Sequence, residues 1–123
     1  MTRILIVDDE IHIIANVVND MLAQNGYQCD IVHTGKEGLE KLKADRYDLV
    51  MLGMHLGDIS GPDLLRYVFD INPKQNVIII SQFAPLDNVI YQDQSMHELP
   101  VLSKPFSIAE MSHKLSDIFT NIN

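Results

Sequence analysis

Five short segments along the chain have the apolar composition of β-strands, and each is followed by residues with helical spacing. The predicted strands are residues 4–7, 27–32, 48–52, 77–80 and 99–102. The first is a continuous apolar run without alternation, which is typical of a strand covered on both faces. The fourth is the most apolar, so we expect it in the middle of the sheet. Pro100 favours an edge position for the fifth.

Between these strands, apolar residues recur every three or four positions, as on the buried face of a helix. We expect helices over residues 11–25, 34–43, 62–71 and 108–119. Gly26 stops the first helix, Thr34 and Ser107 are the expected N-caps of the second and the last, and Pro62 suits a first turn. Residues 83–98 support only a short fourth helix.

A strand followed by a helix, five times over, predicts an α/β fold with a parallel sheet and helices on both faces. The chain shows no linker, internal repeat or low-complexity segment, so we expect residues 1–123 to form a single domain. In such a sheet, functional groups gather outside the carboxyl ends of the strands. The residues at those ends are Asp8, Asp9, Gly53, Ser81 and Lys104.

Charge and composition narrow the classes of partner. Nine basic against seventeen acidic residues leave a net charge of −8, which argues against direct binding of nucleic acid and favours a metal cation or a protein with a basic face. No apolar run approaches the roughly 20 residues of a membrane span, and the first strand leaves no room for a signal peptide. We therefore expect a cytoplasmic protein. The single cysteine, Cys29, excludes an intramolecular disulfide and is expected to be a strand residue without a redox role.

The polar residues at the strand ends allow two interpretations each. Asp8 and Asp9 leave the first strand together, where they either bind a hard cation such as Mg²⁺ or cap the helix that follows. Lys104 precedes Pro105, so its ammonium either reaches over the strand ends or lies on the surface at a turn. The hydroxyl of Ser81 either contacts an anion or caps a loop. Each signal is weak alone, and the set is much stronger together.

This pattern resembles the receiver domain of bacterial two-component response regulators, over the whole chain. The matching segments are Ile4-Leu5-Ile6-Val7-Asp8-Asp9-Glu10, Tyr47-Asp48-Leu49-Val50-Met51-Leu52, Gly61, Val77-Ile78-Ile79-Ile80-Ser81 and Lys104-Pro105-Phe106. The resemblance implies a flavodoxin-like, doubly wound (βα)5 fold with strand order 2-1-3-4-5. It also implies a role in phosphorelay signalling rather than an enzymatic activity.

The resemblance also implies roles for individual residues. Asp8 and Asp9 would bind Mg²⁺ together with the backbone carbonyl of His55, two residues past the acceptor position. Ser81 would contact the phosphoryl group through its hydroxyl, and Lys104 would pair with that group.

The chain departs from the family pattern at the acceptor itself. The aspartate that accepts the phosphoryl group directly follows the third strand, and here that position is Gly53. Without a carboxylate no acyl phosphate forms there, and Mg²⁺ binding is expected to be weak or absent, with Lys104 turning toward Asp8 or Asp9. Three further positions depart from the family pattern: this chain has Gly57 where a proline is common, Gln82 where the family has a small residue, and Val101 where it has an aromatic residue. The fourth helix is also poorly formed in the sequence.

Two explanations of Gly53 remain open at this stage. In one, the chain is a natural pseudo-receiver that works without phosphorylation as a protein-interaction module. In the other, glycine has replaced the acceptor of an ordinary receiver. The complete set of Asp8, Asp9, Ser81 and Lys104 favours the second, whereas Gln82, Val101 and the weak fourth helix favour the first. Asp58, farther along the same loop, is a less favoured substitute acceptor.

Enzymatic alternatives fit the sequence less well. A Mg²⁺-dependent phosphatase of the haloacid-dehalogenase type needs two aspartates spaced two residues apart, whereas Asp8 and Asp9 are adjacent. A flavodoxin-like cofactor binder needs a phosphate-cradling loop after the first strand, where the acidic residues 8–10 would repel phosphate. The expected partner is a histidine kinase, an output domain or another signalling protein, bound through the face of the fourth and fifth helices. Two copies of the chain could form a homodimer through the same face.

Overall fold

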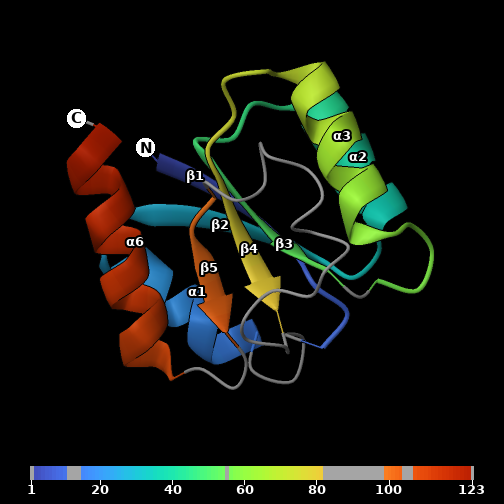
Figure 1. Cartoon of the computed structure of the whole chain (residues 1–123). Helices are drawn as coiled ribbons and strands as arrows, with labels where there is room; N and C mark the ends of the chain where they lie inside the picture. Colours follow the sequence, from blue (N-terminus) through green and yellow to red (C-terminus); the bar gives the residue numbers. More distant parts are fainter. Residues whose placement is uncertain (1, 11–14, 55, 82–98, 104–106, 123) are drawn as a thin grey trace.

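The computed structural model describes residues 2–10, 15–54, 56–81, 99–103 and 107–122, and its elements alternate between strand and helix (Figure 1). In chain order they are β1 (Thr2–Val7), α1 (Ala15–Gln24), β2 (Tyr27–Val32), α2 (Gly35–Ala44), β3 (Leu49–Gly53), α3 (Gly61–Ile71), β4 (Val77–Ser81), β5 (Val101–Ser103) and α6 (Ile108–Ile122). The predicted helix within residues 83–98 lies outside the described residues. Within the described ranges, no helix is long and apolar enough to cross a bilayer.

The five strands form one parallel sheet in the order β2-β1-β3-β4-β5, as predicted. The most apolar strand, β4, lies inside the sheet as expected, between the central strand β3 and the edge strand β5. β3 is just as fully buried, although its sequence is less uniformly aliphatic. The register sets Val7 opposite Leu52 and Gly53 opposite Ile80, which aligns the carboxyl ends of β1, β3 and β4.

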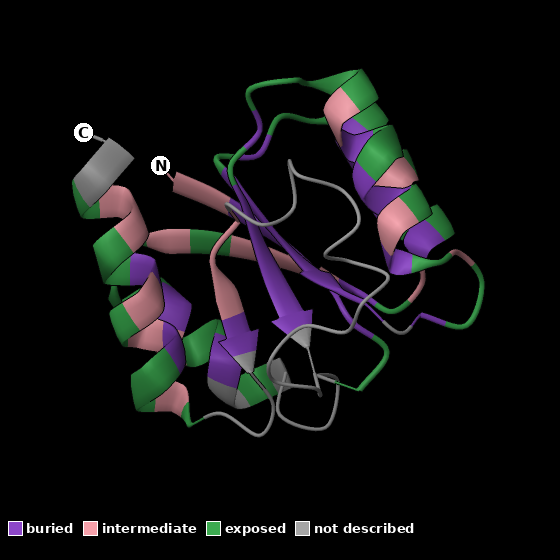
Figure 2. Ribbon diagram, in the orientation of Figure 1, coloured by how far each residue is buried: buried purple, intermediate pink, exposed green. Residues whose placement is uncertain are grey.

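Two apolar layers cover the two faces of the sheet. Figure 1 shows α2 and α3 together on one face and α1 and α6 on the other. Alternate residues of each strand point into different layers: Leu5 and Val7 pack toward α2 and α3, whereas Ile4 and Ile6 pack toward α1 and α6. Figure 2 shows β3 and most of β4 buried, and β1 is buried from Ile4 to Val7, which explains the continuous apolar runs in the sequence.

The local signals at the helix ends mark the boundaries that the structure shows. Gly26 has a φ of 83°, the left-handed conformation that ends α1. Thr34 accepts a hydrogen bond from the amide of Glu37 at the start of α2, and Ser107 accepts one from Glu110 at the start of α6. Asn72 caps the end of α3. The predictions for Gly26, Thr34 and Ser107 are confirmed because each depends only on residues close together in the chain.

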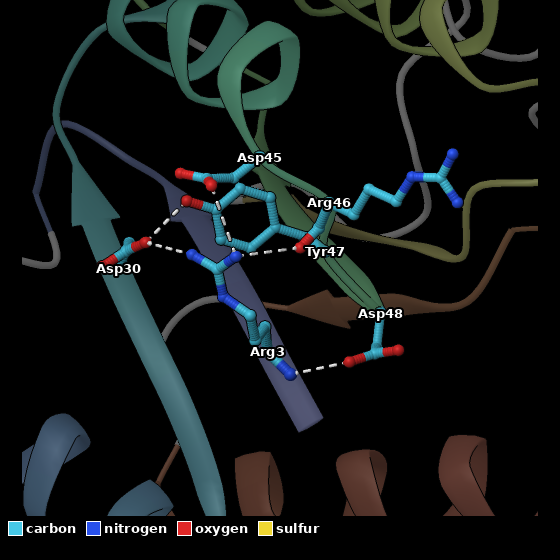
Figure 3. Close-up of polar contacts among 6 residues, drawn as sticks. All are labelled: Arg3, Asp30, Asp45, Arg46, Tyr47 and Asp48. Atoms are coloured by element: carbon cyan, nitrogen blue, oxygen red, sulfur yellow. Dashed lines mark hydrogen bonds and ion pairs between the residues drawn. The ribbon is translucent and has the colours of Figure 1, made fainter. Parts of the chain in front are cut away.

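A polar cluster around Arg3 joins β1 to the segment that precedes β3, at the end of the sheet opposite Gly53 (Figure 3). The Arg3 guanidinium lies 3.6 Å from carboxylate oxygens of both Asp30 and Asp45, and its carbon is 4.8 Å from the centre of the Tyr47 ring. Tyr47 is buried, and its hydroxyl donates to Asp30 at 2.5 Å. Burial and this bond raise the pKa of the Tyr47 hydroxyl, so it remains a donor at neutral pH.

Removing the Tyr47 hydroxyl is expected to cost stability. In Tyr47→Phe the carboxylate of Asp30 loses a short hydrogen bond, and we expect the free energy of unfolding to fall by about 1 kcal/mol. Urea unfolding measures the change. Tyr67→Phe is the matched control, because Tyr67 lies 51% exposed on α3. Equal midpoints for the two variants would contradict a role for the cluster.

Candidate functional site

The carboxyl ends of β1 and β3 bring Asp8 and Gly53 together. Asp8 directly follows β1, its amide donates to the carbonyl of Val32 at 3.1 Å, and its side chain is only 1% exposed. One carboxylate oxygen, Oδ1, accepts a hydrogen bond from the amide of Glu10 at 2.8 Å. The neighbouring Asp9 is exposed. The predicted convergence of the first and third strand ends is therefore confirmed.

The second carboxylate oxygen of Asp8 faces the place where a side chain at position 53 would begin. A Cβ built on Gly53 would lie 3.1 Å from Oδ2 of Asp8 and 3.2 Å from the carbonyl oxygen of Val7. Both separations are tighter than ordinary van der Waals contacts, so a larger residue here requires its neighbours to shift slightly. Gly53 does not have a positive φ. Its backbone conformation therefore does not require glycine.

The remaining predicted residues are placed only in part. Ser81 is the last residue of β4, in register with Ser103 of β5, so its backbone lies at the expected edge of the sheet. Lys104 follows Ser103 in the chain and lies outside the described residues, as do His55 and Gln82. Val101 is half-buried in β5, opposite Ile79.

Asp58, considered above as a substitute acceptor, is bound to the start of α2 instead. Its Oδ1 accepts a hydrogen bond from the amide of Gly35 and its Oδ2 one from the amide of Lys36, both at 2.9 Å. The bond from Lys36 is the main cause that lowers the pKa of this carboxyl group, and the bond from Gly35 adds to it. Asp58 is therefore an ionised helix cap at neutral pH. The sequence did not reveal this role, because the bonded residues are more than twenty positions apart.

The contribution of Asp58 to stability should depend on pH. Because its pKa is lower in the folded chain than in the unfolded chain, its contribution is present above the ordinary aspartate pKa and is lost as the pH falls through the folded value. Asp58→Ala is expected to lower the free energy of unfolding by about 1 kcal/mol at pH 7, since exposure to solvent weakens a charged cap. The difference from the parent chain should shrink below pH 4 (about the ordinary pKa). A difference independent of pH would contradict ionic capping.

The strand-end carboxylates can attract a hard cation, but they cannot form an acyl phosphate at position 53. Asp8 presents a buried carboxylate and Asp9 an exposed one, the oxygen donors that Mg²⁺ prefers. Within the part of the chain that the structure describes, no group of three or more histidine, cysteine or acidic side chains is arranged to hold a metal ion. Asp8 and Asp9 thus offer two carboxylates to a cation, and the neighbouring Gly53 offers no side chain.

Two features close to these residues were not expected from the sequence. Gly61, the first residue of α3, lies so close to Met54 that a Cβ would be 2.9 Å from its carbonyl oxygen and 2.8 Å from its sulfur. Ser60 is the N-cap of α3 and accepts from the amide of Asp63 at 3.2 Å. Cys29 is confirmed as a residue of β2, and burial raises the pKa of its thiol to about 12, which leaves little thiolate at neutral pH.

Comparison with known proteins identifies the class of this arrangement. The model of the response regulator receiver domain family matches residues 4–116. The response regulator ArlR of Staphylococcus saprophyticus is 34% identical over 111 residues, which cover 90% of this chain and 49% of that protein. The chain thus spans about half the length of that relative. Sporulation initiation phosphotransferase F of Bacillus subtilis is 31% identical over 109 residues, with 89% of this chain and 86% of that protein covered.

Solved structures show the same fold. A CheY-like receiver domain protein from Methanospirillum hungatei superposes with a TM-score of 0.84 at 26% identity, covering 98% of this chain and 95% of that one. A response regulator from Thermotoga maritima, solved in complex with Mg²⁺-BeF, gives a TM-score of 0.76 at 27% identity, with coverage of 95% and 98%. The predicted flavodoxin-like fold, with strand order 2-1-3-4-5, is confirmed.

Proposed function

The chain belongs to the response regulator receiver domain family, and from this membership we propose that it acts in two-component signalling as a protein-interaction module that needs no phosphorylation of its own. The observation that supports this proposal is the pairing of Gly53 with Asp8. The residue that would accept a phosphoryl group has no side chain, and the carboxylate of Asp8 faces the place where one would begin.

The immediate surroundings of Gly53 favour the pseudo-receiver over a simple loss of the acceptor. If glycine had merely replaced an aspartate, the place of the missing side chain would be open. Instead, a Cβ there would meet Oδ2 of Asp8 at 3.1 Å and a backbone carbonyl at 3.2 Å. A side chain at this position therefore requires its neighbours to shift by a few tenths of an ångström.

Mg²⁺ is expected to have at most a minor part in this function. Asp8 and Asp9 would hold the ion, with the carbonyl of His55 as a third ligand by analogy with the family. The ion would supply charge neutralisation for the two carboxylates. Two carboxylate charges attract the ion less strongly than the three of an ordinary receiver would. The ion is also not required to keep the strand ends together, since Asp8 is already buried and hydrogen-bonded.

The proposed contact surface includes α6, the last helix. A groove of about 480 Å³ lies between β5 and α6, and its wall carries charges of both signs. It is lined by Val101, Leu102, Ala109, Glu110, His113, Lys114 and Asp117. A histidine kinase, an output domain or another signalling protein, or a second copy of the chain, would contact this face. Mixed charges around a small apolar floor are suited to a specific but reversible contact.

Incubation with acetyl phosphate and Mg²⁺, followed by intact-mass measurement, tests the proposal. We expect no phosphoryl adduct on this chain. Sporulation initiation phosphotransferase F, a relative that covers most of this chain, serves as the comparison protein under the same conditions. An acid-labile adduct that maps to Asp8, Asp9 or Asp58 would show that another carboxylate accepts the phosphoryl group, and the proposed function would then be wrong.

A further inference from the structure

We propose that Asp58 clamps residues 56–60, the β3–α3 loop, to the first turn of α2, so that loop and helix hold one conformation without a metal ion. The inference rests on the proposed function, because a receiver that works without phosphorylation needs the loops at its strand ends held in place without a phosphoryl group. It extends that function by naming the carboxylate of Asp58 as the group that holds the β3–α3 loop in place, through its hydrogen bonds to α2.

The clamp completes the cap of α2. The first turn of a helix leaves four backbone N–H groups without a partner inside the helix. Here the hydroxyl of Thr34 satisfies one of them, the amide of Glu37, at 3.1 Å. Asp58 satisfies two more, at Gly35 and Lys36. Half of the cap of α2 therefore comes from a different element of the fold.

Apolar packing fits the loop against the same turn. Gly35 is buried, and a Cβ on it would lie 3.1 Å from two side-chain carbons of Ile59 and 3.3 Å from Oδ1 of Asp58. The close approach thus depends on glycine at the first position of α2. The other end of the loop is held separately: Leu56 is buried in the layer beneath α2 and α3.

Electrostatics favours the same arrangement. The start of a helix carries a partial positive charge, and a carboxylate placed there gains from both its charge and its hydrogen bonds. Asp58 is ionised at neutral pH, and both of its oxygens are already bonded to amides. The clamp is therefore closed under ordinary conditions, and displacing the loop requires breaking two charge-assisted bonds together.

Backbone NMR relaxation and amide exchange test the clamp with neither metal nor phosphate present. In the parent chain, we expect order parameters near 0.85 for residues 56–60, roughly the value of rigid backbone. Asp58→Ala should lower them toward about 0.6 and raise the exchange rates of the Gly35 and Lys36 amides by roughly tenfold. Asp58→Asn, which keeps one acceptor oxygen, should have an intermediate effect on both.

Thr34→Ala is the matched control, because it removes a cap bond of α2 that does not involve the loop. It should raise exchange at the start of α2 and leave the order parameters of residues 56–60 unchanged. The clamp is wrong if Asp58→Ala leaves the loop rigid, or if Thr34→Ala loosens the loop equally. Because no partner or phosphodonor takes part, this result is distinct from that of the phosphorylation test, and either proposal can fail alone.

Discussion

Gly53→Asp is expected to destabilise the protein in the absence of Mg²⁺ and to make its stability depend on Mg²⁺. The Cβ of the new side chain would lie 3.1 Å from Oδ2 of the buried Asp8, which brings the new carboxylate close to that of Asp8. Two like charges in this place either repel each other or force one to take up a proton, and we expect a loss of about 1–3 kcal/mol in the free energy of unfolding. Adding Mg²⁺ at 100 times its dissociation constant should return about 2.7 kcal/mol.

Gly53→Asn is the matched control for this effect. Asparagine has nearly the same shape as aspartate and carries no charge, and its amide can donate to Asp8. It should lose less stability than Gly53→Asp and should not respond to Mg²⁺. Thermal unfolding of the three proteins with and without Mg²⁺ measures the difference. If the asparagine variant is as unstable as the aspartate variant, packing rather than charge determines the cost of filling position 53.

Gly61→Ala is expected to cost about 3 kcal/mol, because a Cβ at this position collides with Met54. The built atom would lie 2.9 Å from the Met54 carbonyl oxygen and 2.8 Å from its sulfur. The sulfur belongs to a flexible side chain that can turn away, whereas the carbonyl is backbone and moves only if the turn between β3 and α3 moves. Chemical unfolding, monitored by far-ultraviolet circular dichroism, measures the loss.

Gly57→Ala is the control for the same loop. Nothing lies within 4 Å of a Cβ built on Gly57, and this residue does not have a positive φ. We expect no loss of stability and a gain of up to about 1 kcal/mol, since alanine restricts the unfolded chain. If the two alanine variants have the same midpoint, the contact between Gly61 and Met54 does not constrain the residue at position 61.

The elements and the meeting of the first and third strand ends could be predicted from the sequence because each rests on local signals and on one rule of topology. The caps at Thr34 and Ser107 depend on residues three positions apart. The convergence of Asp8 and Gly53 follows from parallel strands. Ile71 is apolar and still 38% exposed, because it is the last residue of α3.

Contacts between distant elements could not be predicted in the same way. The bond from Tyr47 to Asp30 and the bonds from Gly35 and Lys36 to Asp58 join residues that are 17 to 23 positions apart. Aspartates in loops are common, and nothing in their sequence context states which amide they reach. Asp58 therefore looked like a spare carboxylate near the strand ends, whereas its bonds to α2 explain its position without any reaction.

The most direct test of the central claim is an NMR titration with Mg²⁺ and beryllofluoride, which mimics a phosphoryl group, on the parent chain and on Gly53→Asp. The account predicts no saturable response to beryllofluoride in the parent chain and at most weak, local shifts with Mg²⁺ around Asp8 and Asp9. Saturable binding of beryllofluoride by the parent chain, with shifts that extend from Ser81 into α6, would contradict an interaction module that works without phosphorylation.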